Sequence, residues 1–299
     1  MAATYNNLYL DARRDLKRAG AEAAALEARE LLAYAAGKSR QEMFRDMALY
    51  APDEVAGRFA RLLERRLAGE PVAYLIGEWE FYGLSLEITR NVLIPRPDTE
   101  TLAERGILYV RSLKRPARVL DLCAGSGCVG LAVADNCPDC DVVLADWSED
   151  ALQVCRRNIV RCDLEDRVSA ARADALAIPP ALLRDFDLIL CNPPYIPTGD
   201  LAKLDVSVRE YEPMRALDGG EDGLSFYRAV TDRWRAALVP GGRMAFEVGW
   251  DQAPDVKYIL SRQGFQSVAA FQDAGGNWRV VEGDLPPEGN QPELSGQQG

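Results

Sequence analysis

The chain has 299 residues, of which 48% are hydrophobic and 27% charged, a composition typical of a folded globular protein with a full core. Its 46 acidic residues outnumber 35 basic ones, and the formal net charge of −11 disfavours nonspecific binding to nucleic acid or anionic membranes. Histidine is absent, which excludes catalytic triads, zinc sites and general bases that depend on imidazole.

The seven cysteines are an odd number, and the N-terminal segment contains no apolar signal sequence. We therefore expect a cytoplasmic protein with reduced thiols. Cys137 and Cys140 have CxxC spacing, but no second pair or histidine accompanies them, so we expect no metal site. No apolar run approaches the about 20 residues that a membrane helix requires, and we expect no membrane association.

Residues 1–75 are predicted to be helical. Apolar residues recur at helical spacing in one segment, at Val55, Phe59, Leu62, Leu63 and Leu67. Ser39 and Glu42 have the spacing of a capping box, and Gly37 is a candidate end for the preceding helix. The first 85 residues carry 12 basic and 13 acidic side chains, so the acidity of the chain belongs to the larger C-terminal part.

Four regions follow from these patterns. We predict a helical domain over residues 1–75, a β-hairpin linker over 76–92 that turns at Gly83, a catalytic domain over 93–284 and a disordered tail over 285–299. Strands and helices alternate within the catalytic domain, which predicts an α/β fold with a parallel sheet covered on both faces. The predicted strands are 118–122, 141–145, 186–191 and 242–248, the helices are 149–161 and 224–238, and a final antiparallel hairpin pairs 265–272 with 278–282.

A small-residue loop follows the first strand of this domain. Gly125, Gly127 and Gly130 match the GxGxxG pattern, and Asp146 lies about 20 residues further on, where a ribose-binding acid is expected. Alone, the pattern is equally consistent with a tight strand-to-helix turn beside a buried Asp121. The carboxylate of Asp121 before the loop favours the cationic amino-acid moiety of S-adenosylmethionine over the pyrophosphate of NAD.

Asn192-Pro193-Pro194-Tyr195 follows the buried strand 186–191. The two prolines stiffen the turn, so the side-chain oxygen of Asn192 and the carbonyl of Pro193 can bind both hydrogens of an NH₂ group. Tyr195 can stack on a planar acceptor. Orientation of a nitrogen toward a methyl donor can supply about 7 to 11 kcal/mol, so no strong base is required. The alternative is a proline-stiffened loop in which the asparagine caps a turn.

The sequence resembles the bacterial release factor glutamine methyltransferases, the PrmC/HemK group of protein-(glutamine-N5) methyltransferases. Besides the Asn192–Tyr195 motif, the resemblance covers nearly the whole chain and includes residues 71–77 (PVAYLIG), 93–100 (LIPRPDTE), 211–213 (YEP) and 216–224 (ALDGGEDGL). The LIPRPDTE segment together with the N-terminal helices separates this family from adenine-N6 methyltransferases.

The resemblance implies a Rossmann-like, seven-stranded methyltransferase domain and a small N-terminal helical domain that docks the protein substrate. It implies methyl transfer from S-adenosylmethionine to N5 of the glutamine in the Gly-Gly-Gln loop of class I release factors, with S-adenosylhomocysteine as product. By position, Asp121, Asn192 and the loop Cys123, Ala124, Gly125, Ser126 and Gly127 would hold the cofactor, with Asp146 at its ribose and Asp174 and Ala175 at its adenine. Asn192, Pro193, Pro194 and Tyr195 would bind the acceptor amide.

Cys123 stands where methyltransferases usually have glycine, and Ala175 replaces a larger neighbour of the adenine. Other functions remain open from the residues: glutamine methylation of a ribosomal protein, adenine-N6 methylation of nucleic acid, or a noncatalytic binding module. The acidic catalytic domain argues against the nucleic-acid substrate. We expect a monomer with no metal and no direct contact with nucleic acid.

Overall fold

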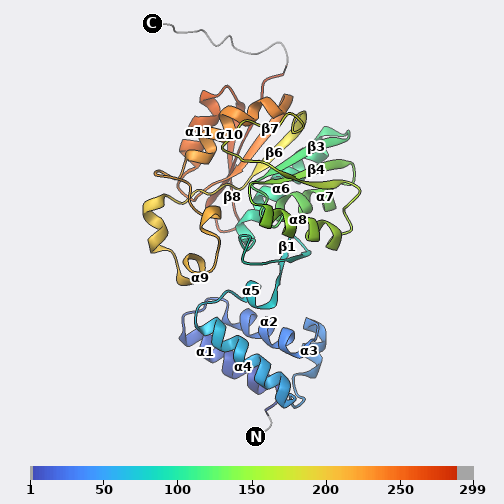
Figure 1. The fold of residues 1–299 in the computed structure, drawn as a ribbon, viewed down its shortest axis with the longest axis vertical. Coiled ribbons are helices and arrows are strands. Elements are labelled where there is room, and N and C mark those ends of the chain that lie inside the picture. The colour runs from blue at the N-terminus through green and yellow to red at the C-terminus, as the bar shows by residue number, and fades with distance from the viewer. Residues whose placement is uncertain (1–2, 288–299) are drawn as a thin grey trace. The chain divides into compact units, whose positions relative to one another are not determined.

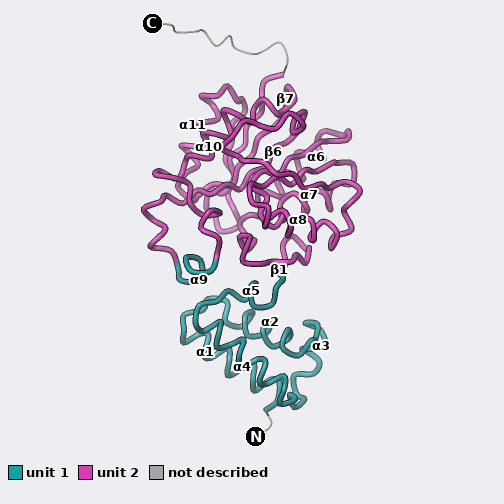
Figure 2. The backbone as a smooth tube through the Cα atoms, viewed as in Figure 1, with its two compact units in different colours: residues 1–78, 205–211 teal, residues 79–204, 212–299 magenta. Residues whose placement is uncertain are grey.

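The computed structural model describes residues 3–287, so residues 288–299 of the predicted tail lie outside the described residues. The chain divides into two compact units (Figure 2). Unit 1 comprises residues 1–78 and 205–211, and unit 2 comprises 79–204 and 212–299. Within the described part of the chain, no helix is long and apolar enough to cross a membrane.

Unit 1 is helical (Figure 1). Its main helices are α1 (Tyr5–Arg18), α2 (Ala24–Ala36), α3 (Arg40–Asp46), α4 (Asp53–Leu67) and α5 (Val72–Ile76). Helix α2 packs against both α1 and α4, because its buried stripe of Ala28, Leu31 and Leu32 meets apolar faces on its two neighbours. The predicted helical character of this region is confirmed.

Local signals set the ends of these helices. Ser39 and Glu42 form the predicted capping box at the start of α3, and Gly37 ends α2 in the left-handed conformation with φ of 62°. On α4, Phe59 and Leu62 are buried as expected, but Leu67 is 42% exposed at the end of the helix. The helical spacing therefore overestimated the length of the buried stripe.

A segment distant in sequence completes unit 1. Residues 205–211, which include the short helix α9 (Val206–Arg209), return from the second half of the chain to this unit. The hydroxyl of Tyr211 donates to the carbonyl of Ala68 at 3.4 Å, and Val206 lies against Gly69. Local sequence patterns gave no sign of this packing.

A two-stranded hairpin of β1 (Glu78–Phe81) and β2 (Leu84–Glu87) comes next, and all of it except Glu78 belongs to unit 2. Tyr82 and Gly83 form its turn, both with positive φ, as a two-residue hairpin connection requires. The buried side chain of Asn158 fixes β2 by accepting from the amide of Glu87 at 2.7 Å and donating to its carbonyl at 3.1 Å. The same side chain donates to the carbonyl of Ser126 at 2.9 Å, so it joins the hairpin to the small-residue loop.

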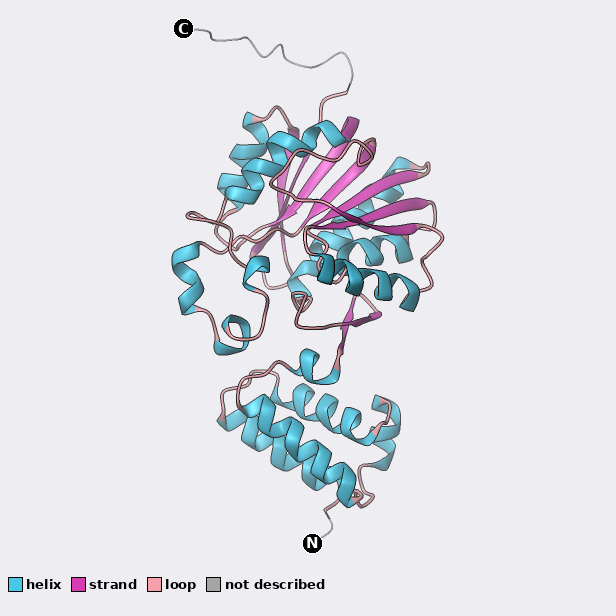
Figure 3. Cartoon of the chain, in the orientation of Figure 1, coloured by secondary structure: helices cyan, strands magenta, loops and turns pink. Residues whose placement is uncertain are grey.

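Seven strands form the sheet of unit 2 in the order β5-β4-β3-β6-β7-β9-β8. Figure 3 draws the strands in magenta and the helices in cyan. Strands β3 to β7 pair in parallel, and β9 is antiparallel to both β7 and β8. The strands are β3 (Ala117–Leu122), β4 (Cys140–Asp146), β5 (Val168–Arg172), β6 (Phe186–Cys191), β7 (Leu238–Glu247), β8 (Gln266–Gln272) and β9 (Trp278–Asp284). The predicted seven-stranded Rossmann-like domain and the antiparallel C-terminal hairpin are confirmed.

Helices cover both faces of this sheet. The α-helices of unit 2 are α6 (Glu100–Leu113), α7 (Cys128–Asn136), α8 (Glu149–Arg161), α10 (Ser225–Arg233) and α11 (Ala253–Arg262). Leu120 and Leu122 of β3 point into a core shared with α10 and α11, while Leu190 of β6 contacts α6 on the opposite face. Side chains thus alternate along each strand and pack into two cores, one on each face of the sheet.

The predicted end of helix 224–238 and the predicted start of strand 242–248 were wrong. The helix expected over 224–238 ends at Arg233, continues as a 3-10 turn (Trp234–Ala237), and gives way to β7 at Leu238. The strand expected to start at Gly242 therefore starts before the Pro240-Gly241 turn signal. Phe186 pairs with Leu238 and Leu188 with Arg243, so the intervening residues of β7 form a bulge that accommodates the proline.

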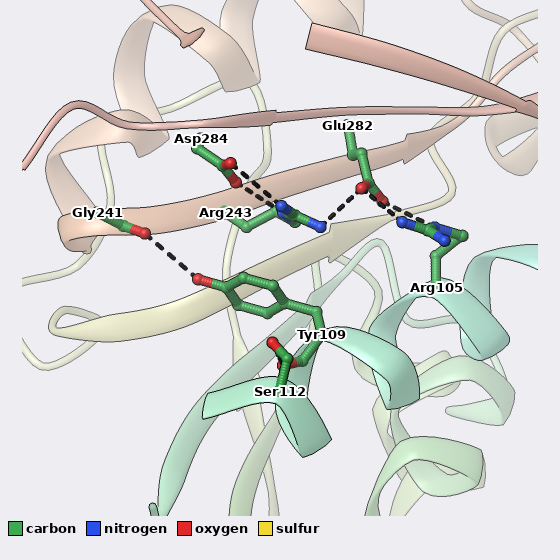
Figure 4. Close-up of polar contacts among 7 residues, drawn as sticks. All are labelled: Arg105, Tyr109, Ser112, Gly241, Arg243, Glu282 and Asp284. Atoms are coloured by element: carbon green, nitrogen blue, oxygen red, sulfur yellow. Dashed lines mark hydrogen bonds and ion pairs between the residues drawn. The ribbon is translucent and has the colours of Figure 1, made fainter. Parts of the chain in front are cut away.

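A cluster of four ionised side chains fastens β9 to β7 and α6 (Figure 4). Arg243 donates to Asp284 at 2.7 and 3.1 Å and to Glu282 at 2.6 Å. Glu282 also accepts from Arg105 of α6 at 2.8 and 3.1 Å. The guanidinium of Arg243 lies 4.4 Å from the ring centroid of Tyr109. Glu282 is buried between two arginines, so its negative charge compensates their positive charges.

We predict that Glu282→Gln lowers the free energy of unfolding by about 2 to 3 kcal/mol, because two mostly buried guanidinium groups lose a shared carboxylate. Denaturant unfolding measures the loss. Glu149→Gln is the matched control, since Glu149 pairs with Arg156 at the surface and its loss should cost less than about 1 kcal/mol. Equal losses in the two variants would contradict the structural role of the cluster.

Candidate active site

A cavity of about 380 Å³ opens at the carboxyl ends of β3, β4 and β6. Strand β3 has β4 on one side and β6 on the other, so the sheet order reverses at this point. Open α/β sheets bind ligands where the order reverses. The lining includes ten of the predicted site residues: Asp121, Cys123, Ala124, Gly125, Ser126, Asp146, Asp174, Ala175, Asn192 and Pro194.

The small-residue loop connects β3 to α7 in a strained course. Cys123 has φ of 65°, in the left-handed region that favours glycine, which gives a physical reason for the glycine usual at this position. The amide of Gly127 donates to the carbonyl of Ala124 at 2.7 Å and closes the turn before α7. Gly127 itself is not part of the cavity lining; it forms the N-cap of the helix.

Asp121 is buried at the end of β3. Its Oδ2 accepts from the amide of Gly130 in the first turn of α7 at 2.8 Å. A Cβ at Gly130 would lie 2.3 Å from a methyl group of Leu144 and 3.0 Å from Cβ of Asp121, so only glycine permits this approach. Burial raises the pKa of Asp121 to about 7, and the hydrogen bond from Gly130 opposes the rise. The carboxyl both caps the helix and faces the cavity.

Asp146 and Asp174 hold loop backbone at the cavity. Asp146 accepts from the amides of Gly125 at 2.9 Å and Ser148 at 2.8 Å, and burial raises its pKa. Asp174 accepts from the amide of Leu176 at 2.8 Å. Both carboxylates keep lone pairs for a ligand, because a carboxylate offers about four acceptor positions.

The Asn192–Tyr195 segment lies directly after β6. Asn192 and Pro194 line the cavity, whereas Pro193 and Tyr195 are not among its lining residues. The amide nitrogen of Asn192 donates to the hydroxyl of Thr99 at 3.5 Å. The carbonyl of Tyr195 accepts from the side-chain amide of Gln252 at 2.9 Å.

The glycine-rich segment after Leu217 supports this motif. Ile196 donates to the carbonyl of Leu217 at 3.0 Å, and Gly219 donates back to the carbonyl of Ile196 at 2.8 Å. A Cβ at Gly219 would lie 2.7 Å from the Cα of Tyr195, so the two segments touch through their backbones. The glycine-rich segment thereby fixes the backbone at the C-terminal end of the motif.

Two distant segments build one wall of the cavity, and sequence reasoning did not predict that the second of them lies there. Residues 91–96 line it, and so do Pro213 and Arg215. The buried Glu212 joins them, since it forms an ion pair with Arg96 and accepts from the amide of Ile94 at 3.3 Å. The acid next to a proline in the YEP segment was the available signal, but it did not indicate that Arg96 is its partner.

Sequence reasoning also missed Glu247. This last residue of β7 is 2% exposed, and its Oε2 has no hydrogen-bond partner. Burial raises its pKa to about 7. An acid at the carboxyl end of an apolar strand was the signal that could have marked it. Among the described residues, no group of three or more Cys, Asp or Glu could hold a metal ion.

The chain is similar to known proteins along most of its length. The PrmC N-terminal domain model matches residues 7–77, and the methyltransferase small domain model matches 105–207. A release factor glutamine methyltransferase of Clostridium acetobutylicum is 38% identical over 84% of this chain and 88% of its own. One of Agrobacterium fabrum is 36% identical over 93% and 96%.

Among solved structures, the catalytic domain of hMettl16 superposes with a TM-score of 0.56 at 16% identity, covering 77% of this chain and 84% of that domain. At that identity, the likeness concerns the fold alone. The sequence relatives, by contrast, match both the helical region and the methyltransferase domain.

Proposed function

The chain belongs to the family of release factor glutamine methyltransferases, and we propose that its cavity binds S-adenosylmethionine beside a glutamine side chain held by Asn192. The observation that carries the proposal is the juxtaposition of Asn192 and the Cys123–Gly127 loop at one cavity. The acceptor we propose is N5 of the glutamine in the Gly-Gly-Gln motif of class I release factors. We also propose a cytoplasmic location, because the proposed substrate is a translation factor, and the seven free cysteines support it.

The residues of the cavity suit S-adenosylmethionine. The volume falls in the range of small-molecule sites, about 300 to 1,000 Å³. Ser126 has a buried hydroxyl with no partner, and Asp121 can attract a cationic amino-acid moiety. We propose that Asp146 binds the ribose and that Asp174 and Ala175 flank the adenine. When bound, S-adenosylmethionine supplies an electrophilic methyl group.

The chain's own contribution is the orientation of the acceptor. Asn192 Oδ1 and the Pro193 carbonyl can each accept one hydrogen of a primary amide, which leaves the nitrogen lone pair directed at the methyl donor. Tyr195 supports the motif by packing. Because Nδ2 of Asn192 is engaged with Thr99, its oxygen is the atom left for the substrate. Such a grip needs no histidine and no metal ion.

We predict that the purified protein transfers label from S-adenosylmethionine to a bacterial class I release factor. Changing the glutamine of its Gly-Gly-Gln motif to alanine should abolish the transfer, since the side-chain amide is the acceptor. Scintillation counting of the separated factor measures it. Label in a ribosomal protein or in DNA, with none in the release factor, would overturn the proposed substrate.

Replacing Asn192 separates catalysis from cofactor binding. We predict that Asn192→Ala lowers kcat by about 100-fold or more, while the Kd for S-adenosylmethionine changes less than about threefold. The reason is that the substrate amide loses its orientation, whereas the loop and the acids proposed to bind the cofactor stay in place. Steady-state kinetics and calorimetry measure the two quantities. Parallel losses in both would show that Asn192 serves mainly the cofactor.

The raised pKa of Asp121 predicts a pH-dependent affinity. Below its pKa of about 7 the carboxyl is mostly protonated and neutral, so its attraction for a cation is lost as pH falls. We predict that the Kd for S-adenosylmethionine weakens by up to about tenfold per pH unit below 7. Asp121→Asn should bind weakly with a flatter dependence. Identical pH profiles for the two proteins would refute the assignment.

We further propose that unit 1 docks the release factor, a role supported by its match to the PrmC N-terminal domain. Phe44 and Tyr50 are 84% and 71% exposed, which suits an apolar contact. Replacing both by serine should raise the KM for the release factor by about tenfold and leave the Kd for the cofactor unchanged. Leu182→Ser, an equally exposed substitution in unit 2, is the control. No change in KM would exclude these two residues from docking.

A further inference from the structure

Trp147 is a large aromatic side chain that the fold leaves half exposed at the cavity. It follows Asp146 at the carboxyl end of β4, lines the cavity and is 54% exposed. Within residues 3–287, its indole pairs with no other aromatic ring and with no cation. An exposed indole forgoes the stabilisation that burial of so large an apolar surface would give. Its place at a cavity therefore points to contact with a ligand.

The backbone on either side of Trp147 is fixed. Oδ1 of Asp146 accepts from the amide of Ser148 at 2.8 Å, which closes a turn around Trp147. Oγ of Ser148 accepts from the amide of Ala151 at 3.3 Å and caps α8. The Trp147 side chain takes part in neither bond. The indole is thus attached to ordered backbone, which lowers the entropy cost of a contact with a ligand.

The loop after β5 leaves the sheet beside Trp147. The amide of Ala173 donates to the carbonyl of Asp146 at 3.0 Å, so the ends of β4 and β5 lie next to each other. Residues 174–176 line the cavity together with Trp147. In this part of the cavity, Ala175 offers only a methyl group and is 4% exposed. It provides too little surface for a planar ring to stack on.

Among the described residues, two aromatic side chains line the cavity, Trp147 and Phe226. Phe226 belongs to α10 and packs against the hydrophobic core of unit 2, which uses part of its ring surface. Trp147 is not part of that core. It is therefore the aromatic group with the larger free surface for a planar ligand.

We propose that Trp147 binds the adenine of S-adenosylmethionine by stacking its indole on the purine. The inference rests on the proposed function, in which Asp146 binds the ribose. Because the adenine is bonded directly to that ribose, a ribose held by Asp146 places the base within reach of the next residue. Stacking of a base on an aromatic side chain strengthens binding by about 5- to 150-fold. Trp147 then supplies the flat surface that Ala175 lacks.

Two adenosine derivatives locate the contact. S-adenosylhomocysteine and 5′-methylthioadenosine share the adenine and the ribose, but only the first carries the amino-acid moiety. We expect Trp147→Ala to raise the Kd for both about tenfold or more and by the same factor, because the stack involves only the shared part. Trp147→Phe should stay within about threefold of the wild type, since a phenyl ring still stacks. Isothermal titration calorimetry measures each Kd.

Trp250→Ala is the matched control. Trp250 also lies in unit 2 and is 69% exposed, but it does not line the cavity, so its loss should leave both Kd values unchanged. Fluorescence gives a second readout. S-adenosylhomocysteine should quench the tryptophan emission of the wild type and of Trp250→Phe, whereas Trp147→Phe should bind it with most of the quenching lost.

An unchanged Kd for both derivatives in Trp147→Ala, with a wild type that binds them, overturns the inference while the proposed function stands. A rise confined to the KM for the release factor overturns it as well, because the indole would then contact the protein substrate. A loss for S-adenosylhomocysteine alone would assign Trp147 to the amino-acid moiety and contradict the stack. A wild type that binds neither derivative overturns the proposed function and the inference together.

Discussion

The parallel pairing of β3 with both β4 and β6 is the constraint on which the site depends. Leu122 pairs with Ala145 on one side and with Cys191 on the other, so three strands end at one level. The loop after β3, Asp146 at the end of β4 and Asn192 after β6 consequently surround one cavity. Loss of this register would separate groups that lie far apart in the sequence.

Two buried acids lie at strand ends on this edge of the sheet. Asp121 and Glu247 both have a pKa raised to about 7 by burial, and they lie at the ends of β3 and β7. Without an opposing charge, burying such groups costs stability at neutral pH, since their ionised forms are disfavoured. The retention of Asp121 is understandable if its carboxylate meets a cation. The low-dielectric surroundings strengthen that interaction.

Much of the fold and part of the site were predictable because their signals are local. The strand 186–191 and helix 149–161 were predicted with the bounds that the structure has, since hydrophobic runs and caps are short-range features. Asp121, the loop after it and Asn192 are likewise local motifs, and the alternation of strands and helices brings them to one sheet edge. Their functional roles stay predictions.

The parts of the fold and of the site that were not predicted depend on contacts between residues far apart in the sequence. Glu212 meets Arg96 across more than a hundred residues, and Thr99 meets Asn192 across 93. These residues lie in recognisable segments, but nothing in the sequence pairs one segment with another. The start of β7 at Leu238 was missed for the same reason, because pairing with Phe186 overrode a local turn signal.

The central claim is that Asn192 and Pro193 hold a glutamine amide by its two hydrogens. A crystal structure of the protein with S-adenosylhomocysteine and a peptide containing Gly-Gly-Gln tests it most directly. The account predicts that the amide nitrogen of the glutamine lies about 2.7 to 3.2 Å from both Asn192 Oδ1 and the Pro193 carbonyl oxygen. An amide bound elsewhere, or an Asn192 that presents its nitrogen to the substrate, would contradict it.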